Sequence, residues 1–206
     1  VHDLQQAIVA ARATGLLPDI VLLLEHEATI TVGRAQQAIG NILDAGEIPV
    51  VTIERGGDVT LHAPGQLVAY PIVQLQGVRQ DLRGHLRRLE DAGIAVCAEL
   101  GVTATRDARN TGVWLPMPDG AARKVMSTGI AVRHWITWHG LALNVDIDLR
   151  LFDRINPCGF QASVMTRLRD HQEDCPSVPE LMGPMARHLL TALELSPGSE
   201  SDRRRV

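Results

Sequence analysis

The chain has 206 residues, of which 45% are hydrophobic and 21% charged, and its formal net charge is −4. This length fits one domain with a sizeable core, or two small ones, and the negative charge argues against a dedicated nucleic-acid binder. No apolar run approaches the roughly 20 residues needed to cross a bilayer, no signal-peptide layout opens the chain, and three cysteines lack disulfide-scaffold spacing, so we expect a soluble, cytoplasmic protein.

The first predicted elements are one helix and a series of short strands. Residues 1–17 place Leu4, Ile8 and Ala11 on one helical face, and Gly15 is a plausible stop. The continuous apolar run 20–24 is typical of a strand covered on both faces. Further strands are predicted at 29–32, 49–53 and 67–73, the last with Pro71 suited to an edge or a bulge.

The second half predicts two long helices separated by a hairpin. Apolar residues recur at helical spacing over 78–100, and Gly101 stands at the C-cap position. Segments 113–115 and 124–132 flank a turn cluster, which indicates a hairpin, and 141–147 reads as a further strand. The last helix, 178–194, begins with the capping-box pair Ser177 and Glu180, although Pro184 could delay or kink it.

These elements predict an α+β fold, with a mixed, largely antiparallel sheet flanked by helices. Strict strand-helix alternation is absent, which disfavours a doubly wound parallel sheet. Residues 1–195 are expected to form a single domain, and the polar segment 196–206 is expected to be a disordered tail.

Cys158 is the first candidate for chemistry because of its neighbours. Pro157 fixes its own φ and Gly159 permits a sharp bend, so the three residues could hold a thiol at the end of a rigid turn. The alternative is a small buried hydrophobe, which is our expectation for Cys97 on the apolar face of the 78–100 helix. Cys175, in an acidic loop, is expected to have no role.

Lys124 is the second candidate. A thiol needs a nearby cation to become a useful nucleophile near neutral pH, and a lysine is one such cation. The alternative is a solvated surface charge, because Lys124 follows Arg123 at the start of a predicted strand. The spacing between Lys124 and Cys158 does not decide whether they meet.

The stretch 55–66 is rich in glycine and lies between two predicted strands. It is either a pair of plain turns or a loop whose exposed amides line a pocket and hold a carbonyl oxygen. Its spacing is not that of a nucleotide P-loop. A zinc site of Cys158, His171 and Cys175 matches no standard pattern, so no metal is expected.

Taken in order, these segments resemble the lipoyl (octanoyl) transferases, the lipoate-protein ligase B family. The glycine-rich segment resembles the family's acyl-pocket motif, and the segments around Lys124 and Cys158 resemble its lysine and cysteine motifs. Four such motifs in order are a specific signal. The matching segments are 55–66, 123–129, 139–145 and 156–159, with 24–26 and 112–115 also fitting.

The resemblance implies the biotin/lipoate ligase fold and transfer of an octanoyl group from octanoyl-acyl carrier protein to a lysine of lipoyl domains. The acceptors would be the lipoyl domains of 2-oxoacid dehydrogenase complexes and the glycine cleavage H protein. Cys158 would carry the acyl thioester, and Lys124 would favour its thiolate and shuttle protons. No ATP or metal is expected, because the donor is already activated.

The resemblance also assigns the acyl site. Ala63 and Leu61 depart from the family's usual glycine and aromatic residue, and Leu61 is expected to reshape the acyl pocket. The expected lining residues are Arg55, Gly56, Gly57, Asp58, Val59, Thr60, Leu61, His62, Ser127, Thr128, Gly129, Gly140, Leu141 and Ala142, with His26, Tyr70 and His139 near the pocket. Two alternatives stay open. One is an ATP-dependent lipoate or biotin ligase on the same fold, and the other is a non-catalytic binding module.

Overall fold

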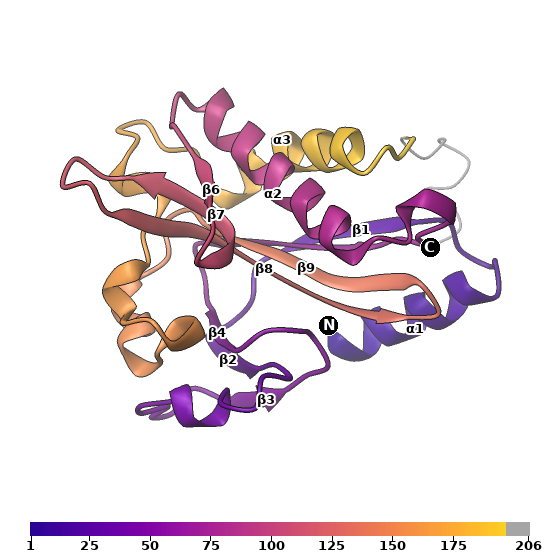
Figure 1. Ribbon diagram of the computed structural model, residues 1–206, viewed down its shortest axis with the longest axis horizontal. Coiled ribbons are helices and arrows are strands. Elements are labelled where there is room, and N and C mark those ends of the chain that lie inside the picture. Colours follow the sequence, from indigo (N-terminus) through magenta and orange to yellow (C-terminus); the bar gives the residue numbers. More distant parts are fainter. Residues whose placement is uncertain (197–206) are drawn as a thin grey trace.

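The computed structural model describes residues 1–196, and its centre is a six-stranded sheet in which every neighbouring pair is antiparallel (Figure 1). The strands follow the order β1 (Ile20–Leu24), β5 (Gln66–Ile72), β9 (Ile136–Asn144), β8 (Ala122–Arg133), β7 (Asn110–Pro116) and β6 (Thr105–Asp107). A smaller sheet places β2 (Thr29–Val32) between β3 (Val50–Thr52), which is parallel to it, and β4 (Val59–His62), which is antiparallel. The predicted mixed, largely antiparallel sheet is confirmed.

Three α-helices cover the large sheet on its two faces. α2 (Leu82–Glu99) and α3 (Val178–Ala192) pack together on one face, and α1 (His2–Ala13) lies against the other (Figure 1). Successive side chains of a strand point to opposite faces of its sheet. In β8, Ile130 packs with the α2 and α3 side chains, while Ala131 packs with those of α1. The sheet is therefore buried on both faces over its middle strands.

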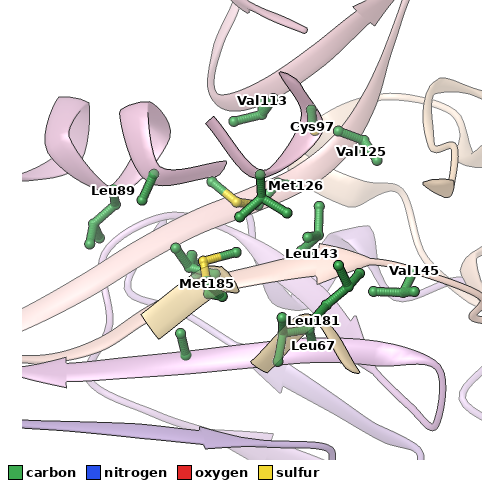
Figure 2. Packing of buried hydrophobic residues seen from close by; sticks show 14 of the residues in the cluster. Leu67, Leu89, Cys97, Val113, Val125, Met126, Leu143, Val145, Leu181 and Met185 are labelled. Atoms are coloured by element: carbon green, nitrogen blue, oxygen red, sulfur yellow. The ribbon is translucent and has the colours of Figure 1, made fainter. Parts of the chain in front are cut away.

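The largest core cluster lies between the sheet and the α2–α3 pair. Leu89 of α2 and Met185 of α3 contribute to it together with Leu67, Met126 and Leu143 from three strands, and all five side chains are buried (Figure 2). This packing fixes α2 against β8.

The first strands differ in part from the predictions. β1 is the edge strand of the large sheet and is only partly buried, although its side chains pack against the core on both faces, Val21 and Leu23 on one and Ile20 and Leu22 on the other. β5, by contrast, lies inside the sheet, although Pro71 suggests an edge or a bulge. Pro71 pairs with Val21 of β1 and falls in a gap of the β5–β9 ladder, because the continuous register ends at Ala69 and pairing resumes where the Thr137 N–H donates to the Val73 carbonyl at 2.9 Å.

The helices and the hairpin follow the predictions closely. α1 ends at Ala13, just before Gly15 with φ +77°, and α2 begins four residues later than expected, after a short 3₁₀ turn. β7 and β8 form the expected hairpin. α3 has its capping box at Ser177 and Glu180, and Pro184 lies inside the helix without ending it.

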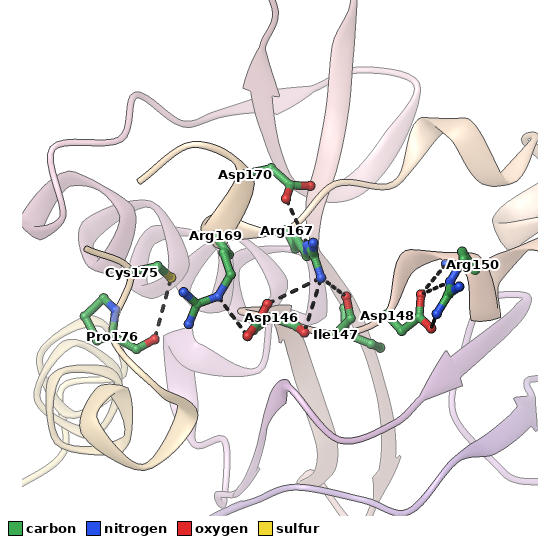
Figure 3. A network of polar contacts seen from close by, with 9 residues as sticks. All are labelled: Asp146, Ile147, Asp148, Arg150, Arg167, Arg169, Asp170, Cys175 and Pro176. Carbon is green, nitrogen blue, oxygen red and sulfur yellow. Dashed lines mark hydrogen bonds and ion pairs between the residues drawn. The ribbon is translucent and has the colours of Figure 1, made fainter. Parts of the chain in front are cut away.

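The segment between β9 and α3 carries no periodic signal in the sequence, yet it contains four short 3₁₀ helices, Leu149–Arg154, Pro157–Gly159, Ala162–Val164 and Leu168–Asp170. Asp146, just past β9, holds this segment through Arg167 at 3.3 Å and Arg169 at 2.8 Å, and Arg167 also contacts Asp170 at 3.0 Å (Figure 3). The loop that carries Cys158 is therefore tied to the end of a central strand.

Residues 197–206, which include nearly all of the predicted disordered tail 196–206, lie outside the described residues. Among the residues that the structure describes, no helix is long and apolar enough to cross a membrane.

Candidate active site

A cavity of about 230 Å³ lies where the two sheets meet the turn that contains Cys158. β4, β5, β8 and β9 form its walls, and the start of β7 closes one side. The lining residues are Ala35, Arg55, Gly57, Asp58, Val59, Thr60, His62, Tyr70, Asn110, Thr111, Lys124, Ser127, Thr128, Gly129, His139, Gly140, Leu141, Ala142, Pro157 and Cys158. Cys158 and Lys124, far apart in the sequence, thus line the same cavity.

Cys158 has an unusual backbone conformation. Its φ and ψ are 55° and 31°, in the left-handed region, which costs a non-glycine residue roughly 1–2 kcal/mol. The turn is closed by the Gly159 N–H, which donates to the Asn156 carbonyl at 3.0 Å, and is anchored by the Asn156 N–H donating to the Asn41 carbonyl at 2.7 Å. These contacts hold the partly exposed thiol at the cavity wall, as the Pro-Cys-Gly sequence predicted.

Lys124 is only 4% exposed, although it is a cation. Its Nζ donates a hydrogen bond to the Asn110 side-chain oxygen and lies 5.4 Å from the centre of the Trp114 ring. Burial lowers the pKa of Lys124, and the charges of Cys158 and Glu90 oppose that shift while Arg55 adds to it. Lys124 is also the only lysine among the 206 residues, so no other lysine could occupy this position.

The glycine-rich loop approaches β8 closely. The Gly56 N–H donates to the Ile130 carbonyl at 2.8 Å, and a Cβ on Gly129 would lie 3.2 Å from the Gly56 oxygen. Arg55 is buried and donates to the Thr31 carbonyl at 2.8 Å, so the loop is fixed on both sides. Burial lowers the pKa of Arg55.

Two neutral imidazole rings, those of His62 and His139, also line the cavity. Burial lowers the pKa of His62 to about 3 and that of His139 to about 4, so both imidazoles are uncharged at pH 7. His62 exchanges a 2.7 Å hydrogen bond with Gln66, whereas His139 Nε2 and Thr128 Oγ1 are buried without a partner among the described residues. Unpartnered polar atoms on a cavity wall are available to a bound substrate.

Three residues expected at the site do not line this cavity. Leu61 is fully buried in the core of the small sheet, whereas Val59, Thr60 and His62 of the same strand line the cavity. Gly56 lines a second cavity of about 550 Å³, and His26 contacts two lining residues, Tyr70 through a 2.7 Å hydrogen bond to its hydroxyl and His62 with 5.4 Å between ring centres.

Ala63, which stands where the family usually has glycine, also lies in the core. Ala63 is fully buried beside Leu61, and its φ is not positive, so no glycine is needed there. Neither Ala63 nor Leu61 lines this cavity, and the effect of Leu61 on an acyl pocket stays a prediction.

Four lining residues, Ala35, Asn110, Thr111 and Pro157, are absent from the set expected on sequence grounds. Asn110 and Thr111 open β7, a strand whose first residues have no chemical signature of their own. They reach the site because β7 pairs with β8, and Trp114 stands opposite Lys124 in that register. Predicting Asn110 and Thr111 as lining residues would have required knowing that β7 pairs with β8, and local sequence does not specify that pairing.

The other thiols and possible metal ligands play no part in the cavity. Burial raises the pKa of Cys97 to about 12 and also raises that of Cys175, and both lie in the main core. Within residues 1–196, no group of three or more His, Cys, Asp or Glu side chains is placed to hold a metal ion. His171 instead shares a 2.7 Å hydrogen bond with the Thr166 hydroxyl.

Sequence comparisons show which known proteins this chain is similar to. The family model described as the lipoyl protein ligase A/B catalytic domain matches residues 2–190. An octanoyltransferase from Gloeobacter violaceus is 48% identical over 147 residues, which cover 71% of this chain and 64% of the relative, just under two thirds of its length. An octanoyltransferase from Syntrophotalea carbinolica is 41% identical over 193 residues, covering 94% of this chain and 88% of the relative.

Solved structures share the fold at low sequence identity. A bipartite lipoate protein ligase from Thermoplasma acidophilum, from a study that includes its E2 lipoyl domain, superposes with a TM-score of 0.73 at 16% identity, covering 98% of this chain and 85% of the other. A lipoate-protein ligase A bound with ATP superposes with a TM-score of 0.68 at 16% identity, covering 90% and 78%. Such similarity establishes the fold, as the sequence motifs implied.

Proposed function

Because this chain belongs to the lipoyl protein ligase A/B catalytic domain family, and its curated relatives are octanoyltransferases, we propose that it transfers an octanoyl group to lysine side chains of lipoyl domains. The predicted enzyme class, an acyltransferase, is confirmed by these relatives. The proposed donor is octanoyl-acyl carrier protein, and the proposed acceptors are the lipoyl domains of 2-oxoacid dehydrogenase complexes and the glycine cleavage H protein.

The presence of Cys158 and Lys124 in one cavity carries this proposal. The Cys158 thiolate attacks the carbonyl carbon of the donor thioester, a new S–C bond forms, and the carrier's thiol leaves with a proton. The acceptor amine then attacks the Cys158 thioester, the amide forms, and the Cys158 thiol is released. Lys124 supplies and accepts the protons, and ping-pong kinetics follow from the covalent intermediate.

The apolar part of the cavity suits the acyl chain. Val59, Leu141 and Ala142 contribute apolar wall, and Lys124 and His139 are among the polar residues that line the same cavity. Thioester exchange is nearly balanced in free energy, and amide formation makes the second step favourable. The proposed reaction therefore uses neither ATP nor a metal ion.

Intact-protein mass after incubation with octanoyl-acyl carrier protein, without ATP, tests the proposal. We expect a gain of one octanoyl group that hydroxylamine removes and that the Cys158→Ser variant lacks. Subsequent addition of an apo lipoyl domain should move the group onto the acceptor. Modification that needs free octanoate and ATP would instead establish a ligase, and no modification under either condition would overturn the enzyme assignment in favour of a binding module.

A further inference from the structure

The side chain of Lys124 is held by a neighbour that the proposed chemistry does not include. An ammonium group has three N–H donors, and one of them reaches the side-chain oxygen of Asn110. A hydrogen bond that a charged group donates favours the charged form of that group. Asn110 therefore opposes the effect of burial, which favours the neutral amine.

Asn110 is itself held in place by Trp114. The indole N–H of Trp114 donates to the Asn110 backbone carbonyl at 3.1 Å, and the Trp114 ring, fully buried, lies under the Lys124 ammonium. Phe160, two residues after Cys158, packs edge-on against the same ring with 6.1 Å between ring centres. The Trp114 indole thus contacts Lys124, the backbone of Asn110, and Phe160 next to the turn that contains Cys158.

The backbone beside Asn110 fits closely around the lysine stem. A Cβ on Gly112 would lie 2.6 Å from Lys124 Cε and would overlap the Met126 carbonyl oxygen. The Gly112 N–H donates to Glu90 Oε1 at 2.7 Å, and Glu90, on α2, is buried and paired with Arg106 at 2.8 Å. The start of β7 is therefore fixed to α2 as well as to β8.

We propose that Asn110 is a positioning residue that holds the Lys124 ammonium in the cavity and directs it toward Cys158. This inference rests on the proposed function, in which Lys124 assists the thiol of Cys158. The charged and titratable groups that face Lys124 are Cys158 from the 3₁₀ turn, Glu90 from α2 and Arg55 from the glycine-rich loop. Among these groups and its neighbours, the amide of Asn110 is the acceptor in direct contact with Nζ.

The single lysine makes a direct test possible. Uniform labelling with ¹³C,¹⁵N-lysine gives one side-chain signal, whose chemical shift against pH reports the pKa of Lys124. We expect Asn110→Ala to lower that pKa and to slow alkylation of Cys158 by iodoacetamide at pH 7 by about tenfold, the size of one hydrogen bond to a charged group. Gln80→Ala, at an exposed glutamine outside the cavity, should change neither.

A second variant separates positioning from folding. Asn110→Asp keeps the shape and an acceptor oxygen, so the pKa of Lys124 should be at least as high as in the parent. If Asn110→Ala fails to fold, the Asp variant decides, because a pKa below the parent's would overturn the proposal. An Ala variant that is folded but unchanged in both readouts would also overturn it.

Neither readout uses an acyl donor. A parent protein that gains no octanoyl group would therefore count against the proposed function, whereas unchanged lysine titration and alkylation in Asn110→Ala would count against the positioning role alone.

Discussion

Cys158 and His139 show how single residues prepare this cavity. Both are non-glycine residues with positive φ, 55° and 61°, and both line the cavity wall. Such conformations persist only where the surrounding contacts determine them, and here Pro157 and the pairing of β9 with β8 do so. Within residues 1–196, these are two of the five non-glycine residues with positive φ, and they are the two that line the cavity.

Replacing Lys124 tests whether its positive charge promotes ionisation of the Cys158 thiol. Lys124→Ala should slow alkylation of Cys158 at pH 7 by about tenfold or more, because a thiolate loses its nearby cation. The difference should shrink at about pH 10, where most thiols ionise without help. Arg123→Ala removes a neighbouring cation that is exposed and should leave the profile unchanged. Equal loss in both variants would mean that general charge, and not the position of Lys124, controls the thiol.

The buried histidines predict a pH dependence of stability. The pKa values of His62 and His139 in the folded state, about 3 and about 4, lie below the unfolded value of 6.5. The unfolded chain therefore binds more protons between pH 6.5 and about 4, so the stability present above pH 6.5 is lost as the pH falls through this window.

Urea unfolding should show a free energy of unfolding lower by roughly 2 kcal/mol or more at about pH 4.5 than at pH 7. His62→Gln should flatten part of this slope, and His134→Gln, at an exposed histidine, should not. A slope that the His62 variant leaves intact would assign the acid sensitivity to other groups.

At the scale of elements, β7 is the strand that joins the site to the core. Its register with β8 shifts between Val113 and Trp114, where the chain passes Gly112 at φ +130°. This irregularity lets Trp114 stand opposite Lys124, while Glu90 of α2 holds the Gly112 amide. The position of Lys124 therefore depends on β7, on the register shift within the β7–β8 pair and on the contact of β7 with α2.

Gly112→Ala tests that arrangement. The added Cβ meets the backbone oxygen of Met126 and the stem of Lys124, so we expect a loss of stability by urea unfolding together with slower alkylation of Cys158. Gly120→Ala is a matched control, since Gly120 also has positive φ, +79°, but a Cβ there meets nothing within 4 Å. Similar losses in both variants would show that backbone strain, and not contact with Lys124, dominates.

At the scale of the whole molecule, the core between the large sheet and α2 positions α2, which carries the Glu90 side chain that binds the Gly112 amide of β7. Leu89 is fully buried in this core, one residue before Glu90. Leu89→Ala should cost about 2–5 kcal/mol of unfolding free energy in urea denaturation, the usual range for a buried leucine. Leu16→Ala, at a residue that is 78% exposed, should cost little. A small loss at Leu89 would mean that α2 contributes less to global stability than its burial indicates.

Much of this protein follows from its sequence, because the relevant signals are local. Hydrophobic periodicity identifies α1 and α2, the capping-box pair identifies the start of α3, and the turn cluster identifies the β7–β8 hairpin. The Pro-Cys-Gly turn predicts a rigid position for Cys158, and the order of motifs predicts the family. The sequence could not place Leu61, because its side of β4 depends on which sheet covers each face of the strand.

Tertiary structure alone decided the contacts between distant segments. The chain does not specify locally that β7 would bring Asn110 to Lys124, that Phe160 would dock on Trp114, or that Asp146 would hold the loop after β9. These contacts depend on strand pairing and helix packing, which are set by the free energy of the whole fold and not by any short segment. The reactive residue types were therefore fixed by the sequence, and their meeting in one cavity by the packing of the sheets.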